Sequence, residues 1–180
     1  MKHTLAILSL LFLLLSCSSN TSPDEDYDSV LRMISETDIK SAIDLTNQWR
    51  TSKPEITSYI NTEELVVIFP DERKVTIPQP ENEMYVAVAP YINETHSCAT
   101  HYISSCQAEL KKKSFLITAG SGNEQILSKT VQSLNNGFIE IWLPRKKEIT
   151  LKIKYDGKVV EESISTYEGD RTCITTMRLK

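Results

Sequence analysis

Histidine and cysteine, two residue types that bind metal ions, are crowded into one short segment of this chain. His96, Cys98, His101 and Cys106 fall within eleven consecutive residues, although the 180 residues include only three histidines and four cysteines. Thiolate and imidazole are the ligands that soft or borderline metals prefer. Cys173, far along the chain, has no other evident partner and is expected to supply a distant donor. The crowding predicts a metal site made of these five residues.

The donor types alone leave the metal open. Thiolates with imidazole suit Cu(I) and Zn(II) about equally. Zinc sites usually contain Cys-x2-Cys pairs, whereas the spacing here is His-x-Cys-x2-His-x4-Cys. Once Cys17 is set aside, three cysteines remain, and three cannot all pair within one molecule. Copper fits this odd number, because thiolates can reduce Cu(II) to Cu(I) as a disulfide forms. Zinc stays the alternative.

A second interpretation needs no metal. Cys98 and Cys106 would then form a plain disulfide that staples a loop of a structural or adhesive lipoprotein, with Cys173 buried and inert. His96 and His101 would be ordinary loop residues. The sequence contains no nucleophile–base pair and no phosphate-binding loop, so we expect a binding protein and not an enzyme.

Glu109 follows Cys106 by three residues. Carboxylates beside metal sites often fix the orientation of a ligating histidine. We therefore expect Glu109 to orient His96 or His101. The alternative is that Glu109 only begins a charged surface segment.

The chain starts with the features of an export signal. An apolar run over 5–15 is too short to span a bilayer and is typical of a secretory signal. Leu-Leu-Ser-Cys17 resembles the lipobox of bacterial lipoproteins, in which cleavage before the cysteine accompanies its lipidation. We expect a signal peptide at 1–16, a lipid on Cys17 and a polar tether over 17–26. Ser18 favours the outer membrane if the cell has two membranes, with the protein facing the periplasm.

Composition narrows the partners. The chain has 20 basic and 24 acidic residues, a net charge of −4. This balance argues against nucleic acid as a partner and favours attraction for cations. The length suits one ordinary domain or two small ones.

The periodicity of apolar residues changes along the chain. Over 27–64 the pattern is helical, with a restart at Asp38 and a third short helix expected through Ile60. Over 65–180 it alternates with a period of two, which predicts six to eight short strands. We expect an α+β fold: a short N-terminal helical region, then an antiparallel β-sandwich of immunoglobulin-like general shape. The closing strand with Cys173 is expected beside the strand that begins near Cys106.

Five blocks in the second part of the chain resemble the CueP family of periplasmic copper-binding proteins. They are Glu83-Met84-Tyr85 leading to Ala89-Pro90-Tyr91, the His/Cys loop from Thr95 to Glu109, Asn136 to Arg145, Tyr155-Asp156-Gly157, and Asp170 to Thr176. The resemblance runs from about Asp38 to the C-terminus.

The resemblance implies several properties. It implies copper binding in the cell envelope through Cys98, Cys106 and Cys173, reduction of Cu(II) to Cu(I), and a part in copper tolerance or supply. It also implies a homodimer formed through the N-terminal region and an envelope protein that receives the copper, such as a superoxide dismutase. The lipobox departs from the soluble form expected for the family, which puts free diffusion to a recipient in doubt.

Overall fold

Two helices open the described part of the chain, residues 23–180 of a computed structural model. α1 (Pro23–Ser35) starts at a proline, which suits the first helical turn because it has no amide hydrogen to leave unpaired. The end of the predicted tether is therefore helical from Pro23 on. The predicted signal peptide (1–16) and the predicted lipidation site Cys17 lie outside the described residues.

α2 (Ile39–Ser52) starts directly after Asp38, where the sequence predicted a restart of the helical pattern. Asp38 Oδ1 accepts hydrogen bonds from the backbone N–H groups of Lys40 and Ser41 at 3.0 and 3.2 Å. Such a cap typically contributes ~1 kcal/mol to stability. The buried residues of this helix recur every three or four positions: Ile39, Ala42, Ile43, Thr46 and Trp49. They form the apolar stripe that the periodicity predicted.

The prediction of a third helix was wrong. Thr57–Ile60 is strand β1, which pairs antiparallel with β2 from Thr57 opposite Ile68 to Ile60 opposite Leu65. Ser58 and Ile60 are buried while Thr57 is exposed, so the side chains alternate as in a strand. Pairing with a partner along the chain decides the conformation of this short segment.

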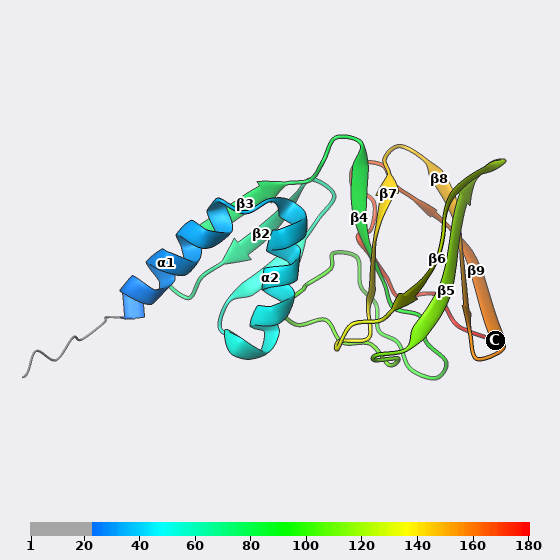
Figure 1. Cartoon of the computed structure of the whole chain (residues 1–180), viewed down its shortest axis with the longest axis horizontal. Helices are drawn as coiled ribbons and strands as arrows, with labels where there is room; N and C mark the ends of the chain where they lie inside the picture. Colours follow the sequence, from blue (N-terminus) through cyan, green and yellow to red (C-terminus); the bar gives the residue numbers. More distant parts are fainter. Residues whose placement is uncertain (1–22) are drawn as a thin grey trace, which may run out of the picture.

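Ten strands form three sheets within residues 23–180 (Figure 1). The first sheet has the order β1-β2-β3, with β2 at Glu64–Ile68 and β3 at Lys74–Pro78. The middle sheet has the order β10-β4-β7, with β4 at Glu83–Val88, β7 at Ile139–Pro144 and β10 at Cys173–Ile174. The third has the order β6-β5-β8-β9, with β5 at Ser114–Ser121, β6 at Glu124–Gln132, β8 at Glu148–Tyr155 and β9 at Lys158–Ser165. The pair β10–β4 is parallel, and the other pairs are antiparallel.

The middle sheet is covered on both faces. Met84, Val86 and Val88 of β4 pack into one core with β5 and β8, which makes the expected sandwich. The alternate residues Tyr85 and Ala87 point the other way, into a core shared with the helices and the first sheet. Because successive side chains of a strand point to opposite faces, β4 is a nearly continuous apolar run. The α+β class and the sandwich are confirmed.

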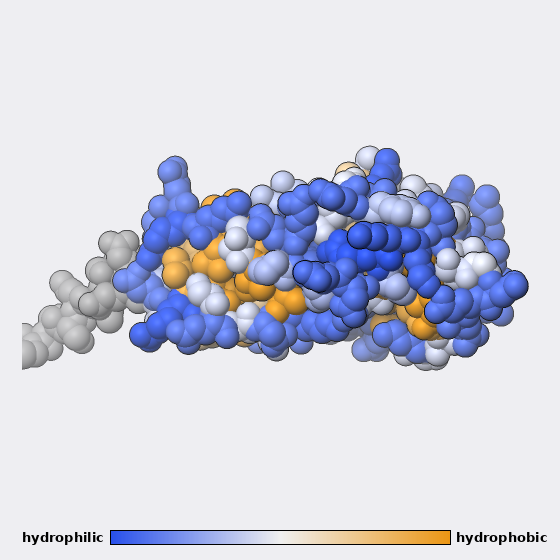
Figure 2. Space-filling model, turned by 90° about the horizontal axis from the view of Figure 1, so that it is seen from above, coloured by the Kyte–Doolittle hydropathy of each residue, from blue (hydrophilic) through white to orange (hydrophobic). Residues whose placement is uncertain are grey.

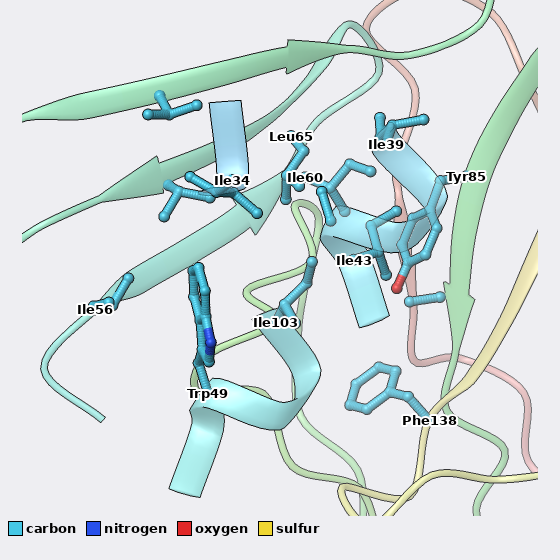
Figure 3. Packing of buried hydrophobic residues seen from close by; sticks show 14 of the residues in the cluster. Ile34, Ile39, Ile43, Trp49, Ile56, Ile60, Leu65, Tyr85, Ile103 and Phe138 are labelled. Atoms are coloured by element: carbon cyan, nitrogen blue, oxygen red, sulfur yellow. The ribbon is translucent and has the colours of Figure 1, made fainter. Parts of the chain in front are cut away.

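The second core joins the N-terminal region to the sandwich. Figure 3 shows Trp49 and Ile43 of α2, Ile60 of β1, and Tyr85 of β4 gathered in the space between these elements. β2 and β3, which fall within the predicted sandwich region (65–180), pair with β1 and not with the sandwich strands. The loop residue Ile103 is fully buried in the same core. The His/Cys segment is therefore held between the N-terminal layer and the middle sheet.

Neither described helix has the length and apolar character needed to cross a membrane.

Candidate metal centre

The His/Cys segment belongs to the long connection from β4 to β5, and backbone hydrogen bonds tie it to two distant strands. Ile60 N–H of β1 donates to His101 O at 2.9 Å. The N–H groups of Thr172 and Cys173 both donate to Ala99 O, at 3.0 and 3.1 Å. The loop is thus fixed against β1 on one side and against the start of β10 on the other.

All five predicted ligands come together in this region, in two overlapping groups. The donor atoms of His96, Cys98 and Cys106 lie within 4.8 Å of one another. Those of His101, Cys106 and Cys173 do the same. The sulfurs of Cys98 and Cys106 are 3.8 Å apart, and the three cysteines are free thiols. Cys106 belongs to both groups and is the central donor.

Cys173 reaches the site by a pairing that the sequence pattern did not predict. β10 runs parallel to β4, with Cys173 opposite Ala87, and not beside the strand that follows Cys106. Both side chains pack in the core on the helical side of the middle sheet. The closing strand is also shorter than expected, because only Cys173 and Ile174 pair as a strand.

The two histidines differ in exposure. His96 is exposed and lines a cavity of about 270 Å³ together with Glu94 and Glu109. His101 has 0% exposure, and its ring lies 4.5 Å from the ring of Phe138. Neither ring nitrogen of His101 has a hydrogen-bond partner among the described residues. Buried polar atoms are nearly always paired. A role as a metal ligand would explain why this imidazole, beside two thiols, has unpaired ring nitrogens.

The three thiols are electrostatically unequal. The thiol of Cys173, whose sulfur lies within 4.8 Å of the Cys106 sulfur, has the largest influence on Cys106, and this contact lowers the pKa of Cys106 to about 3. Burial opposes the shift, and the neighbouring imidazole of His101 adds to it. The same contact raises the pKa of Cys173, and burial raises it further. Burial also raises the pKa of Cys98. At neutral pH one thiolate therefore lies between two protonated thiols.

This difference predicts an unusual pH profile for alkylation. The thiolate is the reactive form, and the low pKa keeps Cys106 as thiolate at any pH well above 3. Its rate of reaction with iodoacetamide should be flat from about pH 5 to about pH 8, whereas an ordinary thiol gains about tenfold per pH unit in this range. Peptide mass spectrometry of the reduced protein measures the three rates. A Cys106 rate that climbs with pH like that of Cys98 would contradict the assignment.

Glu109 lies near the site but is held by backbone amides. Its carboxylate accepts hydrogen bonds from the N–H groups of Ile92, Asn93 and Glu94 at 2.8, 3.0 and 3.2 Å. Burial raises the pKa of Glu109, but these amide contacts outweigh it and the pKa falls below its usual value. The side chain thus fixes the start of the segment that leads to His96. Orientation of a histidine by Glu109 stays a prediction.

Sequence reasoning missed a second carboxylate. Glu140 of β7 lies between the middle sheet and α2, where Asn47 Nδ2 donates to its Oε1 at 2.9 Å. Burial raises the pKa of Glu140, while the bond from Asn47 and the nearby His101 act to lower it. Side chains alternate along β7, so Glu140 points to the other face of the sheet from the buried Ile139 and Ile141. In a strand with one buried face, this other face is usually exposed to solvent. It is covered here because the N-terminal layer packs on that face.

Comparisons with known proteins also support a metal site in this chain. The family model described as periplasmic copper-binding protein CueP matches residues 38–178. The crystal structure of S.CueP superposes with a TM-score of 0.77 at 30% sequence identity, covering 88% of this chain and 99% of that one. No curated protein matches the chain significantly.

Proposed function

Because this chain belongs to the CueP family of periplasmic copper-binding proteins, we propose that it captures copper through Cys98, Cys106, Cys173 and the two neighbouring histidines. The observation that carries the proposal is the convergence of three free thiols with a buried, unpartnered imidazole. A preformed thiolate at Cys106 favours a cation at this point. Soft sulfur donors favour Cu(I) over harder ions.

The geometry favours copper over zinc. A structural zinc site needs four donors arranged as a tetrahedron. Each group here brings three donor atoms together, and the two groups share a sulfur. Zinc is the alternative that a competition between the two ions would detect.

Capture can be tested by titrating the reduced protein with Cu(I) against a colorimetric chelator. We expect about one tightly held Cu(I) per chain, as a multi-thiolate site would hold it. In the variant with Cys98, Cys106 and Cys173 all replaced by serine, the chelator should keep the Cu(I), because the protein no longer binds it tightly enough to compete. The control is Ser105→Ala, which changes an exposed neighbour of Cys106 without removing a donor. Equal affinity in the triple variant, or a fixed disulfide that binds no metal in the native protein, would refute capture.

We also propose that the thiols reduce Cu(II). The sulfurs of Cys98 and Cys106, 3.8 Å apart, lie on one loop and need little movement to bond. Disulfide formation from the Cys106 thiolate and the Cys98 thiol releases two electrons and one proton. Two Cu(II) ions would accept one electron each and become Cu(I). Cys173 would keep its thiol and, with His101, remain as a donor pair. The reaction stops after one turn unless an outside reductant restores the thiols.

Two observations support a location in the cell envelope: the family to which the chain belongs and the signal predicted from its sequence. Periplasmic family membership agrees with the export signal, and we propose that a lipid on Cys17 anchors the protein in the cell envelope. Incorporation of a fatty-acid analogue that disappears in Cys17→Ser would support the anchor. Cleavage without lipidation would refute it.

We also propose that the protein forms a homodimer through its N-terminal region and passes its copper to another envelope protein. Figure 2 shows an apolar area on the N-terminal half of the visible face, while the remainder of that face is mostly hydrophilic. α1 also carries Met33, whose exposed fraction is 49%. Apolar surface of this kind suits an interface between protein chains. Sedimentation velocity of the purified protein measures the dimer directly, and a monomer at micromolar concentration would refute it.

A further inference from the structure

Exposure divides the five donors of the site into an outer and an inner group. The outer group is His96, Cys98 and Cys106, in which His96 is exposed and the two cysteines are half-buried. The inner group is His101, Cys106 and Cys173, in which His101 and Cys173 both have 0% exposure. A copper ion arriving from solvent therefore meets the outer group first.

The two groups also differ in how firmly the fold holds them. His96 and Cys98 lie on the loop alone, where the Cys98 thiol contacts Thr100 O at 3.2 Å. Cys173 lies on β10, which pairs with β4. His101 forms an isolated bridge with Ile60, and its N–H donates to Thr172 Oγ1 at 3.1 Å. His101 and Cys173 are thus held directly by strand pairing. His96 and Cys98 instead lie in loop backbone that is tied at the neighbouring residues Thr95 and Ala99.

Resting on the proposed copper capture, we propose that copper occupies two successive positions: an outer position that receives the ion and an inner position that retains it. Cys106 belongs to both, so the ion can exchange Cys98 and His96 for Cys173 and His101 without losing its bond to Cys106. The step is a ligand exchange, and the oxidation state of copper does not change. Cys173 gives up its thiol proton as it bonds, and Cys98 takes up a proton as it is released.

Because the outer donors receive the ion and the inner donors retain it, loss of an outer donor should slow release, whereas loss of an inner donor should speed it. A donor used only on arrival lowers the barrier in both directions, so its loss should slow uptake and release by the same factor. A donor used only for retention should change the release rate and leave the uptake rate almost unaltered. A single site that used all five donors together would show faster release for each variant.

The test is stopped-flow mixing of the reduced protein with Cu(I) under anaerobic conditions, followed by release to excess chelator. For His96→Ala and Cys98→Ser we expect uptake and release each to slow about tenfold, with the dissociation constant changed by less than about threefold. For Cys173→Ser and His101→Gln we expect release to accelerate about a hundredfold, with uptake within about threefold of the original protein. Ser105→Ala is the control and should match the original protein in both rates.

The outer variants alone decide the outcome, because their side chains are not part of the buried core. Faster release in His96→Ala and Cys98→Ser would show one undivided site and overturn the two positions. Unchanged uptake and release in both variants would show that the outer donors take no part, and would overturn them as well. In either case the original protein still binds Cu(I). A protein that binds no Cu(I) at all would instead refute copper capture itself.

Discussion

Replacing Cys106 with serine is expected to lower the affinity for Cu(I) by at least about a thousandfold, or about 4 kcal/mol of binding free energy. The effect is larger than for any other single donor because Cys106 belongs to both donor groups. It is also the one thiol that the site holds as thiolate at neutral pH, since the neighbouring Cys173 lowers its pKa to about 3. A serine hydroxyl is a hard, protonated donor and cannot replace it.

The affinity is measured by competition with a Cu(I) chelator of known strength, with reduced protein and without oxygen. Ser105→Ala reports on disturbance of the same loop and should bind as the original protein does. Cys106 is only half-buried, so we expect the serine variant to stay folded, and circular dichroism checks this. A loss of less than about tenfold in a folded Cys106→Ser would mean that the copper is held elsewhere.

The second large effect concerns Cu(II) reduction, which Cys98→Ser is expected to abolish. The original reduced protein should convert about two Cu(II) to Cu(I) while it loses about two titratable thiols, because one disulfide supplies two electrons. Without Cys98 the close sulfur partner of Cys106 is missing. Cys173→Ser should only slow the reaction, since the reacting pair remains but the thiol that stabilises the Cys106 thiolate is gone.

Chelator absorbance counts the Cu(I), and peptide mass spectrometry identifies the disulfide. We expect a Cys98–Cys106 bond, with Cys173 still open to alkylation. Full reduction by Cys98→Ser, combined with its loss in Cys173→Ser, would assign the reacting pair to Cys106 and Cys173 instead. Thiols that stay fully titratable beside unreduced Cu(II) would end the redox proposal.

Local patterns in the sequence predicted much of the fold. The sequence predicted a restart of the helical pattern at Asp38, and α2 begins directly after this residue. Apolar residues alternate over 149–155 and Asp156-Gly157 follows, a local pattern typical of a hairpin. β8 and β9 form this hairpin, and both turn residues have positive φ. These features depend on neighbours in the chain, so a single sequence contains them.

Contacts between distant segments could not be read in the same way. The parallel pairing of β10 with β4 joins residues far apart in the chain and leaves no local period. Glu140 has the alternation of a solvent-facing residue and is covered only because α2 packs over β7. The five candidate donors stand out in the sequence because histidine and cysteine are scarce. Their separation into two groups depends on the loop conformation, on which spacing gives no information.

The position of the metal is the most direct test of this account. A crystal structure of the reduced protein loaded with Cu(I), with anomalous scattering measured at the copper absorption edge, locates the ion independently of the protein atoms. We expect a single strong peak bonded to the sulfurs of Cys106 and Cys173 and to a ring nitrogen of His101. A peak bonded to carboxylates elsewhere, with these three side chains unligated, would contradict the assignment of copper to this centre.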